Sequence, residues 1–428
     1  MSRRIIKLIA LTFAVVLALS GCNLVKIDES IDDKTVVATF DGGVVTKGDV
    51  LPAYESNLAY YELLSSYYGY AIPTDGLLEE TVNNLVTDKV LLHKAEELGL
   101  ATLATEETEE AMQEALAAYE DTLDTYWDEF AEEGMTDEEI RGQVEEFMAE
   151  NDYTLEAVIE SYTQLKIINK LRSKVYEGVV VTPEEIQNEY RAMLAADESA
   201  YAEDSFAFES AVTTGMSTIA WYPEGYRTVK HILLSFTEEQ QADLSDIQLQ
   251  ITQIESQIRL LDEDADPTAL QAQLDELKAE LEAKTAEYAA LLQPQVDEIL
   301  AAVEAGEDFE KLMEQYNTDP GMESEPAKSE GYYVSAASET WVAGFRDGAM
   351  ALENIGDVSG AVPTAYGVHI IRYHGDVTPG AVPMDELSEE IEAKLLAEKQ
   401  TAAYDEQVNK WVEEANVKID LKVLNIAE

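Results

Sequence analysis

Two consecutive runs of apolar residues, spaced alternately by three and four positions, place the strongest constraint on the fold of this chain. The first run contains Leu244, Ile247, Ile251, Ile254, Ile258 and Leu261, and the second contains Leu270, Leu274, Leu277, Leu281, Tyr288 and Leu291, with Lys284 in the remaining heptad position. Such spacing is typical of the a and d positions of coiled coils. Between the runs, Asp266 can cap a helix and Pro267 can occupy its first turn. The sequence therefore predicts an antiparallel coiled-coil hairpin, with a break at Pro294 before another helix.

The hairpin directly follows a short apolar segment, "VKHILLSF", which has the composition of a buried β-strand apart from His231. A histidine in such a strand is most often a core residue whose hydrogen bonds are satisfied. A second strand-like segment, "GVHII", carries His369. His374 follows five positions later and therefore faces the opposite side of that strand, which argues against a shared metal site.

Composition excludes several classes of protein. The chain has 4 histidines and 1 cysteine, and it lacks a Gly-rich phosphate loop, a nucleophile elbow and an HExxH motif. We therefore expect no metal ion and no cofactor. Lys and Arg total 28 against 87 Asp and Glu, which gives a formal net charge of −59. A polyanion of this size is repelled by nucleic acid and by anionic lipid, so we expect neither as a ligand.

The N-terminus has the pattern of a secretory signal. "MSRRIIKLIALTFAVVLALSGC" combines basic residues, an apolar core and small residues before Cys22, the only cysteine. "LSGC" resembles the bacterial lipobox, which implies lipidation of Cys22 after removal of residues 1–21. We therefore expect a lipid anchor in the cell membrane, residues 22–35 as a polar tether, and the rest of the chain on the extracytoplasmic face. No later segment approaches the ~20 apolar residues of a membrane span.

The region after the tether begins with "TVVATFDGGVVTKGDV", which predicts a β-hairpin around Asp41, and continues with helical patterns to about Tyr190. "TDEE" from Thr136 and "TPEE" from Thr182 predict capping boxes at the start of later helices. The segment "YYELLSSYYGY" is rich in tyrosine. Packing in the core and on helix surfaces is its favoured interpretation, and an amphipathic lining that binds extended peptides is the alternative.

The pieces on either side of the coiled-coil hairpin resemble the parvulin-type peptidyl-prolyl isomerases. The matching segments, in order, are "VKHILLSF", "GEDFEKLMEQYNTDPG", "EGYYV", "WVAGFRDGAMALENIGDVSGAV" and "TAYGVHIIRY". The resemblance implies an α+β fold with a small antiparallel sheet surrounded by helices, covering residues 226–377. The hairpin, residues 237–293, is inserted after the first strand of this domain.

The flanking regions extend the resemblance to the PrsA-type extracytoplasmic foldase lipoproteins, with a SurA-like chaperone region. This resemblance implies a mostly helical chaperone lobe over residues 36–225. It also implies that residues 378–428 form a helix and a strand that return to complete that lobe. Expected partners are unfolded or nascent secreted polypeptides.

The parvulin resemblance also implies roles for individual residues. His231 and His369 match the facing imidazole pair of the family, Thr364 matches the hydroxyl that orients the pair, and Asp319 matches the Cys or Asp near the reacting amide. The family's substrate pocket maps onto Trp341, Phe345, Tyr366 and Glu330. Glu330 stands where the family usually has an apolar residue, and Trp341 stands where a Met is common, so the pocket departs from the family pattern.

These residues predict a membrane-anchored foldase that catalyses cis–trans isomerisation of X-Pro bonds and assists the folding of secreted proteins. The alternative is a holdase or assembly chaperone whose parvulin domain only binds client chains, an interpretation supported by Glu330 and Trp341. The inserted hairpin has two interpretations of its own. It is either a solvated spacer or a docking arm that forms a homodimer.

Overall fold

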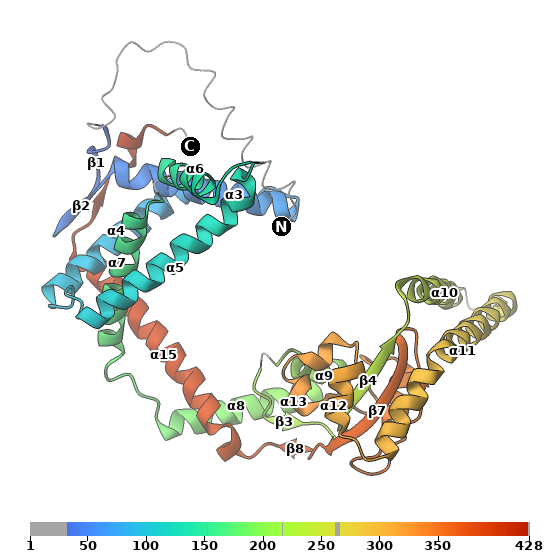
Figure 1. Ribbon diagram of the computed structural model, residues 1–428. Coiled ribbons are helices and arrows are strands. Elements are labelled where there is room, and N and C mark those ends of the chain that lie inside the picture. The colour runs from blue at the N-terminus through green and yellow to red at the C-terminus, as the bar shows by residue number, and fades with distance from the viewer. Residues whose placement is uncertain (1–31, 133, 152, 216, 262–265, 427–428) are drawn as a thin grey trace. The chain divides into compact units, whose positions relative to one another are not determined.

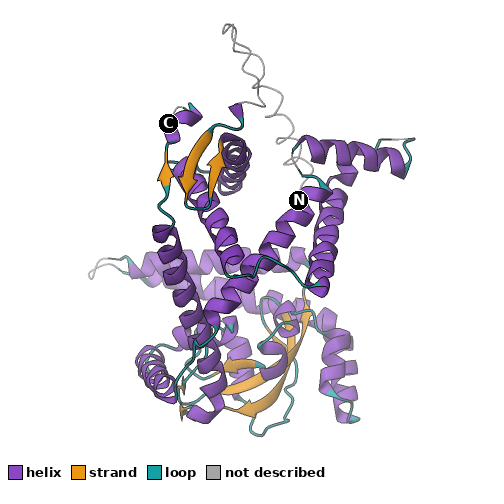
Figure 2. Cartoon of the chain, turned by 90° about the vertical axis from the view of Figure 1, so that its left-hand side faces the viewer, coloured by secondary structure: helices purple, strands orange, loops and turns teal. Residues whose placement is uncertain are grey.

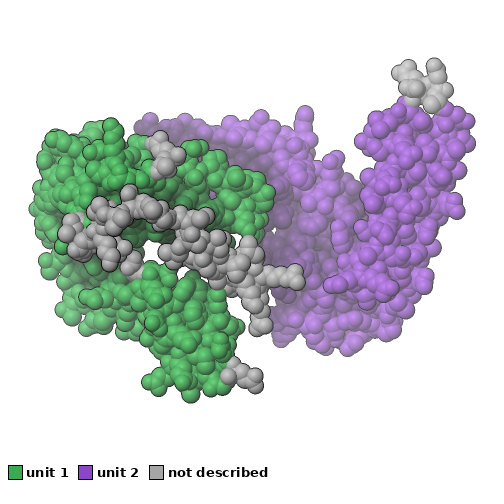
Figure 3. Space-filling view, turned by 90° about the horizontal axis from the view of Figure 1, so that it is seen from above, with its two compact units in different colours: residues 1–180, 397–428 green, residues 181–396 purple. Residues whose placement is uncertain are grey.

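The computed structural model describes residues 32–132, 134–151, 153–215, 217–261 and 266–426. The predicted signal segment and Cys22 lie outside these residues. The chain forms two compact units, one from residues 1–180 with 397–428 and the other from residues 181–396 (Figure 3). Helix α15 (Met384–Glu414) contributes residues to both units. None of the helices in the described ranges is long and apolar enough to cross a membrane.

The first unit contains a three-stranded antiparallel sheet in the order β2-β1-β9. Strands β1 (Val36–Phe40) and β2 (Gly43–Thr46) form the predicted hairpin, and β9 (Lys418–Ile419) pairs with β1. Gly42 has a φ of 114°, and a Cβ at this position would lie 2.3 Å from the His93 ring. The turn therefore requires glycine, both for its backbone conformation and for the close approach of His93.

Helices make up the rest of the first unit (Figure 2). They are α3 (Lys47–Tyr68), α4 (Leu77–Glu97), α5 (Thr105–Phe130), α6 (Asp137–Glu150) and α7 (Leu155–Tyr176). The Thr136 side chain accepts a hydrogen bond from the Glu139 N–H and the Glu139 side chain accepts from the Thr136 N–H, which confirms the predicted capping box. One core surrounds the sheet, and a second core joins α5, α6 and α7 around Leu123 and Val144.

The second unit begins with α8 (Pro183–Tyr201), α9 (Ser205–Thr214) and β3 (Trp221–Tyr222), the last paired with β8 (Gly380–Ala381). Residues 181–225 and 378–396 thus belong to this unit, whereas the sequence boundaries place them in the chaperone lobe. An aromatic cluster accounts for the difference. Phe208 is fully buried, with its ring 4.6 Å from that of Tyr226 and 5.8 Å from that of Tyr333. Tyr226 directly precedes strand β4 of the main sheet, and Tyr333 belongs to its strand β5. Helix α9 therefore packs against that sheet.

The main sheet of the second unit has four antiparallel strands in the order β5-β4-β7-β6. Its long central strands are β4 (Arg227–Ser235) and β7 (Gly367–Asp376), and its edges are β5 (Tyr332–Val334) and β6 (Val362–Pro363). In the β4–β7 register, His231 lies opposite Ile371, and Leu233 lies opposite His369. Since side chains alternate along a strand, both histidines face the same side of the sheet.

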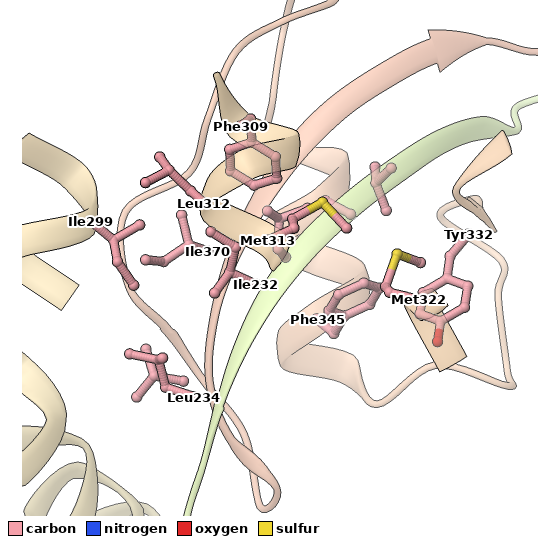
Figure 4. Close-up of a cluster of buried hydrophobic side chains, with 14 of the residues drawn as sticks. Ile232, Leu234, Ile299, Phe309, Leu312, Met313, Met322, Tyr332, Phe345 and Ile370 are labelled. Atoms are coloured by element: carbon pink, nitrogen blue, oxygen red, sulfur yellow. The ribbon is translucent and has the colours of Figure 1, made fainter. Parts of the chain in front are cut away.

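The opposite side of the sheet is covered by α12 (Phe309–Tyr316) and the C-terminal part of α11 (Thr268–Glu304). Figure 4 shows Ile232 and Ile370 pointing toward Ile299 and Leu312 of these helices, with Phe345 on the other side of the strands. Phe345 belongs to α14 (Ala343–Met350), which covers the face that carries the histidines.

Helices α10 (Glu238–Arg259) and α11 form the predicted coiled-coil hairpin (Figure 1). Ile247, Ile251 and Leu274 are buried in its seam. The predicted break at Pro294 is wrong, because α11 continues through this residue to Glu304. An internal proline costs a helix about 3 kcal/mol. Beyond it, Val296 and Ile299 are completely buried in the sheet core, which contributes about 1.5–3 kcal/mol for each side chain and offsets that cost.

Candidate active site

A chain of side-chain hydrogen bonds crosses the face of the sheet that α14 covers. Thr364 Oγ1 lies 2.9 Å from His369 Nε2, and His369 Nδ1 lies 2.9 Å from His231 Nδ1. His231 Nε2 lies 2.8 Å from Asp319 Oδ2, which also accepts a 2.8 Å hydrogen bond from the Tyr332 hydroxyl. These hydrogen bonds therefore join five side chains from three separate parts of the sequence.

The two imidazoles are held by the central strands. His231 on β4 is 2% exposed and His369 on β7 is 5% exposed, and their rings stack with centroids 5.1 Å apart and planes 18° apart. The apolar character of both strands follows from their central position, since each is covered by helices on both faces. The sequence interpretation of His231 as a buried, hydrogen-bonded histidine holds, and its partners are His369 and Asp319.

Asp319 is positioned by the loop that follows α12. It is the N-cap of the short helix η2 (Pro320–Glu323), and its Oδ1 accepts a 3.0 Å hydrogen bond from the Gly321 N–H. The preceding Asn317 ties this loop to β4, because its Oδ1 accepts a 2.9 Å hydrogen bond from the Leu233 N–H and its Nδ2 donates to the Asp319 carbonyl. The carboxylate is therefore fixed from its own loop and from the adjacent strand.

The hydrogen bonds allow one continuous order of donors and acceptors with both imidazoles neutral. The Tyr366 N–H donates to Thr364 Oγ1, whose hydroxyl donates to His369 Nε2. His369 Nδ1–H then donates to His231 Nδ1, and His231 Nε2–H donates to the Asp319 carboxylate. The pair of histidines is thus oriented by a hydroxyl at one end and by an anion at the other.

Burial and neighbouring charges set the protonation states at the two ends of the chain. Burial is the main cause that lowers the pKa of His369, the proximity of His231 acts in the same direction, Asp319 opposes both, and the resulting pKa is about 3. Burial raises the pKa of Asp319, but the hydrogen bonds that its carboxylate accepts from His231, the Tyr332 hydroxyl and the Gly321 N–H outweigh burial and lower the pKa to about 2. At neutral pH, His369 is therefore neutral and Asp319 is an anion.

The histidine pair forms the floor of a cavity of about 390 Å³. Its walls include the aromatic side chains of Tyr332, Trp341, Phe345 and Tyr366. The Trp341 ring lies 4.4 Å from the Tyr332 ring, and its Nε1–H donates a 2.8 Å hydrogen bond to the Tyr333 carbonyl. Tyr366 is 55% exposed at the rim, whereas Phe345 is buried and contacts both imidazoles edge-on. The cavity thus combines an apolar wall with a polar floor.

The structure brings together all but one of the residues expected at the site. The exception is Glu330, which does not line the cavity and accepts a 2.8 Å hydrogen bond from the Tyr333 hydroxyl. Glu330 ends α13 (Ala327–Glu330), and Gly331, with a φ of 84°, reverses the chain after it. A Cβ at Gly331 would lie 2.7 Å from the Val229 carbonyl oxygen, so only glycine allows this turn against β4.

Tyr332 and Gln241 are two of the cavity-lining residues that the sequence reasoning did not identify. Tyr332 enters the site instead of Glu330, since β5 pairs with β4 and places alternate residues on the histidine face. Period-two alternation in "EGYYV" contains this signal, because one of the adjacent tyrosines had to face the site. Gln241 also lines the cavity, and it comes from α10, the first helix of the inserted hairpin. No motif indicated that the insertion contributes to the site.

No group of three or more His, Cys, Asp or Glu side chains is arranged to hold a metal ion in the part of the chain that the structure describes. The polar groups that the structure places at this site are a fixed carboxylate, two imidazoles and a hydroxyl next to an apolar wall.

Residues 274–375 match the rotamase family model, the PPIC-type peptidyl-prolyl isomerase domain. With the geometry above, this match defines a peptidyl-prolyl isomerase domain of the parvulin type. The match starts within α11 and does not include β4, because the hairpin separates that strand from the rest of the domain. Asp319, Thr364 and His369 lie within the matched range, and the structure adds His231 through its contact with His369.

The chain is homologous to foldase proteins named PrsA, which confirms the resemblance inferred from the sequence. PrsA of Geobacillus sp. (strain WCH70) is 35% identical over 129 residues, which cover 30% of this chain and 44% of that protein. PrsA of Clostridium perfringens (strain 13 / Type A) is 24% identical over 411 residues, which cover 93% of this chain and 90% of that protein. Among solved structures, PrsA of Bacillus subtilis is 18% identical, with 92% and 100% coverage and a TM-score of 0.23. A SurA-like chaperone structure from Campylobacter jejuni is 15% identical, with 90% and 100% coverage and a TM-score of 0.24.

Proposed function

We propose that this chain is a membrane-anchored extracytoplasmic foldase that catalyses cis–trans isomerisation of X-Pro bonds and assists the folding of secreted proteins. The observation that carries the proposal is the hydrogen-bonded pair of His231 and His369 at the floor of an aromatic cavity, with Asp319 fixed beside it. The homology to PrsA foldases supports the same assignment.

The reaction requires a site that binds a twisted amide more tightly than either planar isomer. Rotation about the peptide bond has a barrier of about 18–20 kcal/mol, because twisting removes amide resonance. No covalent bond is broken, so a nucleophile is not needed. The cavity is suited to hold a proline ring against Phe345 and Trp341, with the X-Pro carbonyl directed toward the polar floor.

Asp319 acts electrostatically in this proposal. A planar amide carries partial negative charge on its oxygen, and this charge decreases when resonance is lost. A carboxylate near the oxygen therefore repels the planar state more than the twisted state, which lowers the barrier. The low pKa of Asp319, about 2, keeps the carboxylate ionised at neutral pH. His231 holds it in place, and Thr364 fixes the ring of His369 from the other side.

The direct test is a prolyl isomerisation assay on a short X-Pro peptide with the mature full chain. We expect the wild type to exceed the spontaneous rate, and we expect His231→Ala and His369→Ala to lose most of that excess. If the wild type does not exceed the spontaneous rate, the holdase function replaces the isomerase function. Tyr332 and Trp341, with rings 4.4 Å apart in the cavity, favour that second candidate because they narrow the space for a proline ring.

Refolding of an aggregation-prone client, measured with the same variants, separates the two functions. A foldase that works through isomerisation loses refolding yield when His231 is replaced. A holdase keeps its yield in the same variant, because binding of the client does not depend on the imidazole pair.

The membrane anchor is a separate part of the proposal, and it rests on the lipobox-like "LSGC" sequence that ends at Cys22. We expect the cell to process the chain before this residue and to attach a lipid to its thiol. Labelling with a radioactive fatty acid should mark the wild type and not Cys22→Ala. Equal labelling of both proteins would contradict the anchor at Cys22.

A further inference from the structure

The C-terminal half of α3 and the turn after it carry an unusual density of exposed aromatic side chains in the first unit. Six tyrosines occur between Tyr54 and Tyr70. Tyr60 is 58% exposed, Tyr67 78%, Tyr68 56% and Tyr70 63%, and Leu63 beside them is 37% exposed. We call these five exposed residues, Tyr60, Leu63, Tyr67, Tyr68 and Tyr70, the tyrosine surface. The core part of the favoured sequence interpretation, packing in the core and on helix surfaces, does not hold for its members, because they face solvent.

The tyrosine surface is held in place by local contacts. Tyr67 and Tyr68 meet edge to face with centroids 5.2 Å apart, and Tyr68 lies 5.9 Å from Tyr70. Gly69 ends the helix in the left-handed conformation, with a φ of 75°, which directs the following residues back along α3. The Ile72 N–H then donates a 2.9 Å hydrogen bond to Ser65 Oγ. The rings are therefore presented as an ordered group, so a partner does not have to order them on binding.

The sequence segment that carries this surface has charged residues of one sign. Between Lys47 and Lys89 the sequence contains no Lys, Arg or His. The same stretch contains Asp49, Glu55, Glu62, Asp75, Glu79, Glu80 and Asp88. Of these, Asp49 forms an ion pair with Lys89, and Glu62 lies within the tyrosine surface itself. Tyrosine faces and carboxylates both attract cations, the rings through their quadrupole and the carboxylates through their charge.

The charge of the chain excludes several occupants. Nucleic acid and anionic membranes are repelled by a net charge of −59, as is a second copy of the same chain approaching through an acidic surface. The remaining occupant is cationic. A folded basic protein offers few apolar groups to the rings, whereas an unfolded basic segment offers the stems and charges of Lys and Arg together with exposed apolar side chains.

We propose that the tyrosine surface binds extended polypeptide segments rich in Lys and Arg, independently of proline. The surface lies in the first unit and the histidine pair in the second, so this binding goes beyond the proposed isomerase function. Basic client segments would be bound through cation–π contacts with the rings and through the carboxylates beside them. The proposal thus names a class of client for this chain, basic unfolded segments. Without it, the net charge of the chain indicates only solubility.

The test uses the mature full chain and fluorescent, unstructured peptides without proline. One peptide carries Lys and Arg between apolar residues, and a matched peptide carries Glu at the same positions. The variant is Tyr60→Ser with Tyr67→Ser and Tyr70→Ser. The control is Met112→Ser with Leu116→Ser, which removes exposed apolar side chains (48% and 43% exposed) from α5 in the same unit. Circular dichroism verifies that both variants keep their helices.

We expect the triple tyrosine variant to bind the basic peptide about tenfold more weakly, since each exposed cation–π contact contributes a factor of about two to five. We expect the α5 control to bind like the wild type and the acidic peptide to bind weakly to all. Isomerisation of a short X-Pro peptide should be unchanged in the triple variant, which separates this proposal from the isomerase function.

Three outcomes would overturn the proposal. The first is unchanged affinity of the triple variant for the basic peptide, and the second is equal affinity of the wild type for the acidic peptide. The third is a concentration-dependent dimer in sedimentation that the triple variant abolishes, because this surface would then be an interface between copies of the chain. A charge-reversal variant, Glu62→Lys, keeps the test decisive if serine disturbs the helix, since it should weaken basic-peptide binding without removing a ring.

Discussion

Replacing Tyr332 by Phe removes one hydroxyl from the candidate active site and leaves its apolar wall intact. The hydroxyl lies 2.8 Å from Asp319 Oδ2, and the Asp319 side chain is 20% exposed. The lowered pKa of Asp319, about 2 against an ordinary 3.8, corresponds to about 2.4 kcal/mol of stabilisation of the ionised form, at 1.36 kcal/mol for each pKa unit. The hydrogen bond from His231 provides the largest lowering contribution, and the hydrogen bond from Tyr332 provides a smaller one. We therefore assign roughly 1 kcal/mol to the Tyr332 bond.

The prediction for Tyr332→Phe concerns stability and activity together. At pH 7, the free energy of unfolding should fall by about 1 kcal/mol. The pKa of Asp319 is lower in the folded state than its unfolded value of 3.8. The contribution of Asp319 to the free energy of unfolding is therefore complete above pH 3.8 and is lost as the pH falls through about 2. The difference between variant and wild type should therefore shrink between about pH 4 and about pH 2. Isomerase kcat/KM at neutral pH should fall about fivefold, because a loss of 1 kcal/mol in positioning corresponds to that factor.

Tyr333→Phe provides a matched control for this experiment. Tyr333 is the next residue, and its hydroxyl donates a hydrogen bond of the same length, 2.8 Å, to Glu330 outside the cavity. Urea unfolding at neutral and acidic pH and the isomerisation assay are run on both variants. The reasoning is refuted if Tyr333→Phe lowers kcat/KM as much as Tyr332→Phe, or if the stability loss of Tyr332→Phe is the same at both pH values.

Three further predictions follow from the same geometry. Thr364→Val leaves His369 Nε2 buried without a hydrogen-bond donor and should lower kcat/KM about tenfold. Thr364→Ser keeps a hydroxyl and should retain most of the wild-type kcat/KM. Equal kcat/KM for the Val and Ser variants would contradict the orienting role of Thr364. Phe345→Ala removes a ring that is 2% exposed and should lower the unfolding free energy by about 3–5 kcal/mol in calorimetry, and a loss below about 1 kcal/mol would show that the wall is not part of the core. Deletion of residues 249–277, bridged by a short Gly-Ser linker, should leave kcat/KM and the oligomeric state in sedimentation unchanged if the hairpin is a spacer. The deletion keeps Leu244, which is buried in the sheet core, and a change from dimer to monomer would favour the docking arm.

The sequence was sufficient to predict the histidine pair because the segments around His231 and His369 resemble the parvulin family, and that resemblance implies a facing pair of imidazoles. His231 and His369 each lie in a short apolar segment. Apolar segments of this length form buried strands, and side chains on neighbouring strands can lie on the same face of the sheet. The coiled-coil hairpin was equally predictable, since its heptad spacing is local.

The features that sequence reasoning missed depend on contacts between distant residues. The period-two alternation in "EGYYV" indicates that one of the two tyrosines faces the site. The turn of Gly331 against the Val229 carbonyl, which places Tyr332 there instead of Glu330, is a contact between distant residues. Pro294 predicts a break in the helix, but burial of Val296 and Ile299 against the sheet overrides that local preference. The unit boundary also follows distant packing, since Phe208 inserts among aromatic side chains of the sheet.

The inserted hairpin has a consequence for how quickly the isomerase domain can fold. His231 and His369 are 138 residues apart, a separation that slows formation of the β4–β7 pair. Because α10 and α11 pair with each other locally, with Asp243 contacting Lys284 and Tyr288 near their base, the hairpin can form first and bring its own two ends together. Once the hairpin has formed, the chain between His231 and His369 that still has to close as a loop is shorter, by less than half. The free energy of closing this loop therefore changes by only about 0.5 kcal/mol. The central strands can therefore meet as if the insertion were a short turn.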